Sequence, residues 1–311
     1  MAKLVISFLV AVSRHGRAGL TFGLVAGLLL PEVASAMKPL LPYLVMALLF
    51  LVALRIGPTR ARHGLLDLPT TLALVLILQL VVPLLVVGLA LAFGIGASPY
   101  VLAAVLVLSA PSVSGSPNFA TILNADPEPA FRMLIVGTAL LPFTMLPVLW
   151  LLPQFDDPTT ILVPALRALI AITCAMGIGF FARATLLPNP SIEHTNAMDG
   201  AMTVALAIIV VALMAALRPA MAESIGLVIG WLALAFGVNI GMQVLFFGLL
   251  RGALPQGDRV PVSIVAGNRN FAIYLVALSP VIAEPLLIFL GCYQVPMYLT
   301  PLLMSRLFRS V

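Results

Sequence analysis

Long apolar runs of about 20 residues recur along this sequence, with short polar stretches between them. About 20 helical residues cross a hydrocarbon layer of ~30 Å, so runs of this length predict transmembrane helices. Only 9% of the 311 residues are charged, whereas about a quarter are charged in a soluble domain. The sequence therefore predicts an all-α polytopic membrane protein surrounded by membrane lipid. Its formal charge of +5 is interpreted as an orientation signal rather than as a nucleic-acid surface.

Ten apolar runs are long enough to span. Residues 1–12 precede them and are too short to cross, so they are interpreted as an interfacial segment. The predicted spans are Ala18–Met37, Pro39–Ile56, Leu68–Phe93, Tyr100–Leu123, Phe131–Leu152, Thr160–Phe181, Gly200–Leu217, Ser224–Leu250, Val260–Leu278 and Pro285–Leu307.

The distribution of positive charge predicts the orientation of these spans. With the N-terminus inside, most lysines and arginines fall on the cytoplasmic side, and only Lys38 and Arg218 fall outside. Arg167 and Arg269 lie within spans. This asymmetry follows the positive-inside rule and predicts an inner (plasma) membrane protein with both termini in the cytoplasm.

The ten spans divide into two halves of five. The first half covers residues 1–153 and the second covers 158–311, with a short outer loop between them. Since each half has an odd number of spans, the second half is predicted to run inverted relative to the first. We infer this repeat from the layout of the spans and not from residue identity.

Polar interruptions occur in the fourth span of each half. Ser112–Asn118 interrupts the fourth span, and Val265–Phe271 interrupts the ninth. Gly115, Pro117 and Gly267 are predicted to break these helices, because proline lacks an N–H and glycine permits backbone geometry that other residues resist. Two broken helices at matching positions of two halves are typical of a transporter's binding site.

A helix break exposes backbone groups that can bind ions. The free N–H groups attract anions and the free carbonyls attract cations. Short polar side chains at the two breaks, and one amide in the third span, are therefore candidates for substrate binding. These residues are Ser114, Ser116, Asn118, Asn268, Arg269, Asn270 and Gln79. The alternative, which applies also to Asn239 and Gln243 of the eighth span, is that the serines and amides only form hydrogen bonds between helices.

Arg269 carries a charge inside the apolar ninth span, at the expected depth of the membrane. A charge at bilayer depth is costly and rarely faces lipid. Three interpretations stay open for Arg269: direct contact with an anionic substrate, a fixed cation bonded to backbone carbonyls at the break, or a pair with a carboxylate. Every acidic residue falls at a span end or in a loop, which weakens the third interpretation.

Several sequence patterns of other functions are absent. The three histidines lie in predicted cytoplasmic loops, too scattered for a metal site. No phosphate-binding glycine loop indicates an ATP-driven pump, and no Ser/His/Asp or paired-carboxylate pattern indicates hydrolysis. The sequence therefore predicts a protein that is not an enzyme, with no catalytic residues, no metal site and no cofactor.

The layout and the two interruptions resemble the bile acid:sodium symporter family, including its pantoate-type and arsenite-efflux relatives. The resemblance extends over nearly the whole chain. Its specific residues are Ala110-Pro111, Ser116-Pro117-Asn118, Gly267-Asn268-Arg269-Asn270, and Gln79 followed by Pro83. The resemblance implies a mobile core domain of spans 3–5 and 8–10, a panel domain of spans 1, 2, 6 and 7, organic-anion substrates and sodium coupling.

The residues at the expected sodium sites depart from the family pattern. Sodium-coupled members begin the ninth-span motif with glutamate and have glutamine before its final asparagine, where this chain has Val265 and Arg269. Hydroxyl residues expected early in the fifth span are missing from Ala130–Ile135. Two like charges ~4 Å apart repel by several kcal/mol at intermediate dielectric. We therefore predict that the sodium sites are lost and that the Arg269 guanidinium takes the place of a bound cation.

The sequence as a whole predicts a secondary active transporter that moves a small or amphipathic organic anion by alternating access. One alternative is a sodium-coupled symporter that uses other ligands. Another is a membrane sensor or accessory subunit that binds a ligand without moving it, although the short loops leave no room for a signalling domain. The pattern specifies neither the substrate nor the oligomeric state.

Overall fold

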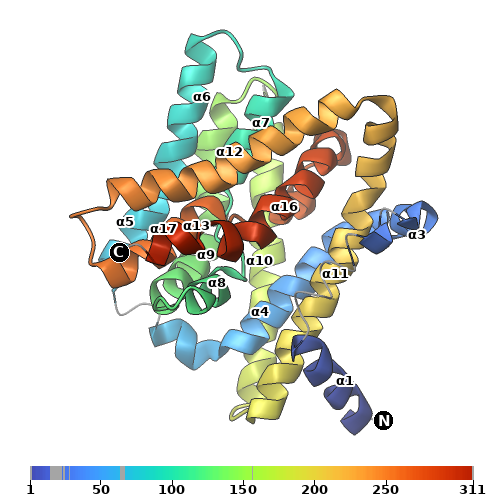
Figure 1. Ribbon diagram of the computed structural model, residues 1–311, viewed down its shortest axis with the longest axis vertical. Helices are drawn as coiled ribbons and strands as arrows, with labels where there is room; N and C mark the ends of the chain where they lie inside the picture. Colours follow the sequence, from blue (N-terminus) through green and yellow to red (C-terminus); the bar gives the residue numbers. More distant parts are fainter. Residues whose placement is uncertain are drawn as a thin grey trace. The chain divides into compact units, whose positions relative to one another are not determined.

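The computed structural model describes residues 2–14, 23, 25–27, 29–63, 67–155 and 157–309 (Figure 1). Regular secondary structure in these ranges is helical, without a β-strand. Seven helical stretches in the same ranges are long and apolar enough to cross a membrane. They are Pro31–Thr59, Leu68–Ala92, Glu128–Leu151, Pro158–Leu186, Ile192–Glu223, Ile225–Leu249 and Pro280–Phe308. The chain is thus an all-α, multi-pass membrane protein.

Three of the ten predicted spans have no continuous helix of this kind. The first, 18–37, lies partly outside the described residues, which leave out 15–22, 24 and 28. The fourth and ninth are each divided by a short non-helical segment, as their polar interruptions predict. The count of ten spans and the inverted repeat therefore stay predictions.

Helix lengths differ from the predicted span lengths where helices extend past the apolar runs. The helix α11 (Ile192–Glu223) begins eight residues before the predicted seventh span and ends six residues after it. The Ser191 side chain caps α11 by accepting a hydrogen bond from the backbone N–H of His194. Because polar residues continue the helix once it is capped, hydropathy alone sets its bounds too narrowly.

The chain divides into two units. Unit 1 contains residues 1–63 and 170–225, and unit 2 contains residues 64–169 and 226–311. The helix α10 (Pro158–Leu186) passes from unit 2 into unit 1. The assignment of a mobile core and a panel stays a prediction.

In unit 1, glycines let other helices approach α11 closely. A Cβ at Gly200 would overlap the carbonyl oxygen of Leu9 in α1 (Ala2–Arg14). A Cβ at Gly23 would lie 3.0 Å from the Ala207 carbonyl oxygen, and one at Gly27 would lie 2.7 Å from the Met214 Cβ. Gly23 and Gly27 form a G-x-x-x-G pattern, which membrane helices use to pack backbone against backbone.

A kink lies near the end of a transmembrane helix of unit 1. In α4 (Leu41–His63), Gly57 has φ 75° and Pro58 follows it. Pro58 has no N–H to donate to the carbonyl of Leu54, four residues earlier. Arg183 supplies the missing donor, because its Nη1 lies 3.0 Å from the Leu54 oxygen and 3.2 Å from that of Arg55. An arginine thus caps carbonyls that a break has freed.

Unit 2 contains the two divided helices and the elements around them. In chain order these elements are α5 (Leu68–Leu76), η2 (Ile77–Val81), α6 (Val82–Ala92), α7 (Pro99–Ser109), α8 (Ser116–Ile122), α9 (Glu128–Leu151), α12 (Ile225–Leu249), α13 (Gln256–Gly267), η3 (Phe271–Ile273), α14 (Tyr274–Ala277), α15 (Pro280–Ala283), η4 (Glu284–Leu286), α16 (Leu287–Leu303) and α17 (Ser305–Arg309).

The segment η2 is a π-helical turn between α5 and α6. In it, the N–H of Val82 donates to the carbonyl of Ile77, five residues earlier. The next bond of this register would join residue 83 to the carbonyl of Leu78, but Pro83 has no N–H. The π-turn therefore leaves the Leu78 carbonyl oxygen without a helical donor.

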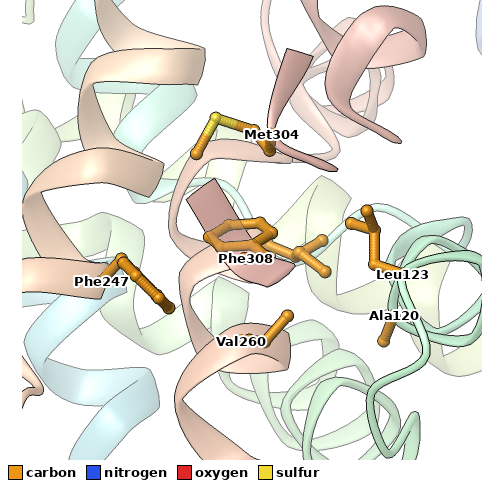
Figure 2. Close-up of a cluster of buried hydrophobic side chains, with 7 residues drawn as sticks. Ala120, Leu123, Phe247, Val260, Met304 and Phe308 are labelled. Carbon is orange, nitrogen blue, oxygen red and sulfur yellow. The ribbon is translucent and has the colours of Figure 1, made fainter. Parts of the chain in front are cut away.

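An apolar cluster packs together several elements of unit 2 (Figure 2). It joins the end of α12 to α13, to α8 and to the C-terminal residues. The Phe247 and Phe308 rings lie 5.0 Å apart, centroid to centroid. The buried members are Ala120, Leu123, Phe247, Val260, Ile264, Met304 and Phe308.

Candidate functional site: two broken helices paired in unit 2

Both polar interruptions form breaks in their helices. After α7 the chain turns extended at Ala110, with ψ 153°, and it becomes helical again at Ser116. After α13 the chain is non-helical over residues 268–270, and η3 begins at Phe271. The polar residues of both interruptions therefore lie at or beside backbone that forms no helical ladder.

The two breaks pair with each other. Ser112 and Arg269 face one another in a single antiparallel β-bridge. The N–H of Val113 donates to the carbonyl of Asn268 at 3.0 Å, and the N–H of Asn270 donates to the carbonyl of Pro111 at 2.7 Å. These bonds satisfy backbone groups that the breaks would otherwise leave unpaired inside an apolar body. We call this paired segment the crossing.

Arg269 lies at the crossing and is 2% exposed. Its guanidinium donates to three backbone carbonyls: Nε to Ala266 at 3.2 Å, Nη1 to Ala110 at 3.1 Å and Nη2 to Leu78 at 3.1 Å. None of the ion pairs among the described residues includes Arg269. Of the three interpretations left open by the sequence, these contacts match the fixed cation.

Each of the three acceptors is free for a separate reason. Ala110 ends α7 and precedes a proline in extended backbone. The helical donor for Ala266 would be the N–H of Asn270, which donates to Pro111 instead. Leu78 loses its donor through the π-turn and Pro83. Because the carbonyl ends of helices carry partial negative charge, three of them suffice to hold a guanidinium without a carboxylate.

Asn268 belongs to a fully buried polar network. Its Oδ1 accepts from Asn239 Nδ2 at 3.2 Å and from the hydroxyl of Thr300 at 3.1 Å. Its own Nδ2 donates to the carbonyl of Ile264 at 2.9 Å. Gln243 extends the network, donating to Asn239 Oδ1 at 2.9 Å and to the Thr300 hydroxyl at 3.1 Å. The network fixes the break of α13 to α12 and α16.

Gly267 is held from two sides. Its carbonyl accepts from Asn239 Nδ2 at 2.6 Å and from the Tyr293 hydroxyl by a short hydrogen bond. The Tyr293 oxygen in turn accepts from the backbone N–H of Arg269 at 3.1 Å. A Cβ at residue 267 would overlap the Asn239 carbonyl oxygen. Glycine is required here by close packing.

The prediction that Gly115 and Gly267 adopt backbone geometry that other residues resist is wrong. Gly115 has φ −79° and ψ −13°, which any residue adopts. Gly267 is the last residue of α13 and is not among the glycines with positive φ. Pro117 lies in the first turn of α8, where a missing N–H breaks no helical bond. It therefore starts the helix after the break.

Gln79 lies in the π-turn and is 1% exposed. Its Nε2 donates to the carbonyl of Gly137 at 2.9 Å and to the Thr144 hydroxyl at 3.2 Å, both in α9. A Cβ at Gly137 would lie 2.7 Å from Gln79 Oε1. Gln79 thus joins α9 to the helix that supplies Leu78 to Arg269.

The side chains of the remaining predicted residues form no hydrogen bond among the described residues, and we call them uncommitted. Ser114 and Asn270 are half-buried, and Asn118 is exposed. Ser116 is 0% exposed, and its Oγ has no hydrogen-bond partner. Among the described residues, none of these four side chains makes a hydrogen bond, so the predicted set separates into committed and uncommitted members.

The sequence analysis missed two hydroxyl residues of the site, Tyr293 and Thr300. Both lie in the apolar tenth span, where a single hydroxyl does not interrupt the hydropathy pattern. Thr300 falls between Pro296 and Pro301. Prolines in a membrane helix free carbonyls that neighbouring side chains can satisfy, and this was the available signal. The Thr300 hydroxyl lies 3.2 Å from the Pro296 oxygen.

Within the described ranges, no group of three or more His, Cys, Asp or Glu side chains could hold a metal ion. Comparison with known proteins finds no family that matches the chain and no curated protein that matches it. The family resemblance therefore stays a prediction.

Proposed function

We propose that this protein is a secondary carrier that binds a small or amphipathic organic anion at the crossing and moves it by alternating access. The observation behind this proposal is the pairing of two broken helices, with polar side chains on both, inside an apolar unit. Such pairs form the binding sites of many transporters, because they place backbone dipoles and polar groups at membrane depth. The fold would then be of the bile acid:sodium symporter type.

The uncommitted side chains are the proposed substrate contacts. Ser114, Ser116 and Asn118 belong to the first break and Asn270 to the second. Hydroxyl and amide donors suit a carboxylate or a similar oxyanion. Gln79, Asn268 and Arg269 form hydrogen bonds with protein groups and would position the crossing instead of contacting the substrate.

The fixed charge of Arg269 supports transport without bound sodium. A sodium ion needs several oxygen ligands, and three converging carbonyl oxygens already accept from the guanidinium. A second cation beside it would meet like-charge repulsion. In this proposal the guanidinium supplies permanently the positive charge that a coupling ion would bring.

The test is flux into proteoliposomes. Radiolabelled organic monocarboxylates, first selected by thermal stabilisation of the purified protein, are added with sodium or with choline outside. We expect saturable uptake at the same rate in both salts. Asn118→Ala should lower uptake at least tenfold, whereas Asn196→Ala on α11, an asparagine of unit 1, should leave it unchanged.

Two outcomes would contradict the proposal. Uptake that requires sodium would move the coupling ion to other oxygens of the crossing and would leave the role of Arg269 unexplained. Binding of an anion without any flux, in protein that is correctly inserted, would indicate a membrane sensor or accessory subunit.

A further inference from the structure

Arg259 is a buried arginine in the first turn of α13, away from the crossing. It is 6% exposed. Its guanidinium carbon lies 4.1 Å from the centroid of the Phe247 ring, in a cation–π contact. Phe247 belongs to the apolar cluster of unit 2, beside Val260 and Phe308 (Figure 2). A charged group is therefore held against apolar side chains.

Two nitrogens of this guanidinium have no hydrogen-bond partner. They are Nε and Nη2, and both are shielded from solvent. The ion pairs among the described residues do not include Arg259, although Asp258 precedes it. The face of an aromatic ring attracts a cation but cannot replace in-plane acceptors for two N–H groups. Buried donors of a charged group without an acceptor are strongly unfavourable.

The corresponding two nitrogens of another arginine, Arg55, form a complete ion pair. In unit 1, Arg55 Nε lies 2.8 Å from Asp199 Oδ1, and Arg55 Nη2 lies 3.3 Å from Asp199 Oδ2. The Nε–Nη2 edge of a guanidinium presents two parallel N–H groups that match the two oxygens of a carboxylate or phosphate. This edge of Arg55 is paired with a carboxylate, whereas the same edge of Arg259 has no hydrogen-bond partner.

We propose that Arg259 is the anchor of an oxyanion site beside the apolar cluster of unit 2, with phosphate as the ligand chemistry. The α13 helix has 12 residues, and the positive end of its dipole lies beside Arg259. The N–H groups of Asp258 and Arg259 themselves donate to the Pro255 carbonyl. The oxyanion accepts from Nε and Nη2 as Asp199 does from Arg55. Its source is either the headgroup of an acidic phospholipid or a free phosphate. The site is separate from the crossing and does not depend on the transport proposal.

The experiment measures thermal unfolding of the detergent-purified protein with three probes at fixed ionic strength. The probes are inorganic phosphate, dioctanoyl phosphatidylglycerol, and dioctanoylglycerol, which has the same chains without phosphate. We expect phosphatidylglycerol to raise the unfolding midpoint and dioctanoylglycerol not to raise it. A rise with inorganic phosphate as well identifies free phosphate as sufficient, and no such rise identifies the lipid headgroup.

Variants assign the effect to the two-donor edge. Arg259→Met keeps the apolar stem and should weaken the apparent affinity for phosphatidylglycerol at least tenfold. Arg259→Lys keeps the charge but lacks the paired donors, and should weaken it about threefold or more. If the Met variant does not fold, the Lys variant decides. Arg306→Met, which changes an exposed arginine of α17, should bind as the parent protein does.

Two results would overturn the assignment. The first is a parent protein that neither phosphatidylglycerol nor inorganic phosphate stabilises. The second is a pair of Arg259 variants that respond to the probes like the parent protein. In either case the Nε–Nη2 edge would be an unfavourable feature of unit 2 without a ligand.

Discussion

The two breaks at the crossing are built in opposite ways. At the second break, Asn268 and Arg269 are 0% and 2% exposed, and protein groups accept or donate at their polar atoms. At the first break, Ser116 is equally buried but its hydroxyl has no partner, and Asn118 is exposed. The comparison teaches that the second break serves as a support, with Asn270 as its one uncommitted polar side chain among the described residues, whereas the first break keeps several polar groups available for a ligand.

The strongest way to break this comparison is to remove the support. Arg269→Ala leaves three buried carbonyls without their donor, and we expect it to lower the free energy of unfolding by about 3 kcal/mol or more and to abolish transport. Thermal unfolding and proteoliposome flux measure the two effects. Millimolar methylguanidinium should partly restore the stability of the Ala variant, because a ligand that binds only the folded state stabilises it. Unchanged stability and flux would remove Arg269 from the site.

A matched pair of hydroxyl deletions compares the network around Asn268 with the contact of Gln79 to α9. Thr300→Val removes a hydroxyl that bonds three amide side chains, whereas Thr144→Val removes one that accepts from Gln79 alone among side chains. We expect losses of about 2 and about 1 kcal/mol, respectively, because unsatisfied buried partners remain in both variants. Chemical or thermal unfolding of the two variants side by side measures the difference. Equal losses would mean that the Thr300 network and the contact of Gln79 with Thr144 contribute alike to stability.

Deletion of an uncommitted hydroxyl tests the other side of the comparison. Ser116→Ala removes an Oγ that has no protein partner, so stability should stay the same or rise slightly. If this hydroxyl binds substrate, KM for the transported anion should rise about tenfold, equivalent to ~1.4 kcal/mol. Flux against substrate concentration measures KM. A loss of stability with unchanged KM would make Ser116 a structural residue.

The smallest effect is expected outside both breaks, at Asp157, which precedes α10. Hydrogen bonds from the backbone N–H and the hydroxyl of Thr159 lower the pKa of the Asp157 carboxyl. Its stabilisation is therefore complete above the ordinary carboxyl pKa of ~3.9 and is lost as the pH falls through the lowered value. Asp157→Asn should give a small fall in the unfolding midpoint at pH 7 that disappears at the acid end, with normal flux. A change in flux would show that a residue outside the two breaks also contributes to transport.

The sequence was most informative where a polar residue interrupts an apolar run. Such interruptions located both breaks and marked Arg269 as unusual, because lipid excludes unpaired charge. The partners of Arg269 were not predictable residue by residue, since all three are backbone carbonyls. Pro83 was visible in the sequence, but its effect on Leu78 depends on the π-turn, which hydropathy does not reveal.

The site residues that the sequence did not predict have side chains that hardly change the hydropathy of an apolar helix. Tyr293 and Thr300 add a single hydroxyl to an apolar helix, and only the tertiary structure brings them to Gly267 and Asn268. Conversely, Gln79 and Asn268 were predicted as substrate ligands from their polarity, their place at or before the breaks and the family resemblance. Polarity in a membrane span indicates that a partner exists, but it does not tell whether that partner is a ligand or the protein.

The acceptors of Arg269 have a consequence for how the protein tolerates sequence change. Because the three oxygens are main-chain atoms, a substitution at Leu78, Ala110 or Ala266 can alter the side chain without deleting an acceptor. An insertion or deletion between Ile77 and Pro83 would rotate the carbonyl of residue 78 away from the Arg269 guanidinium, even if every other residue stayed the same. The three acceptors of Arg269 therefore depend on the number of residues between the elements that carry them, and not on the identity of the side chains at these three positions.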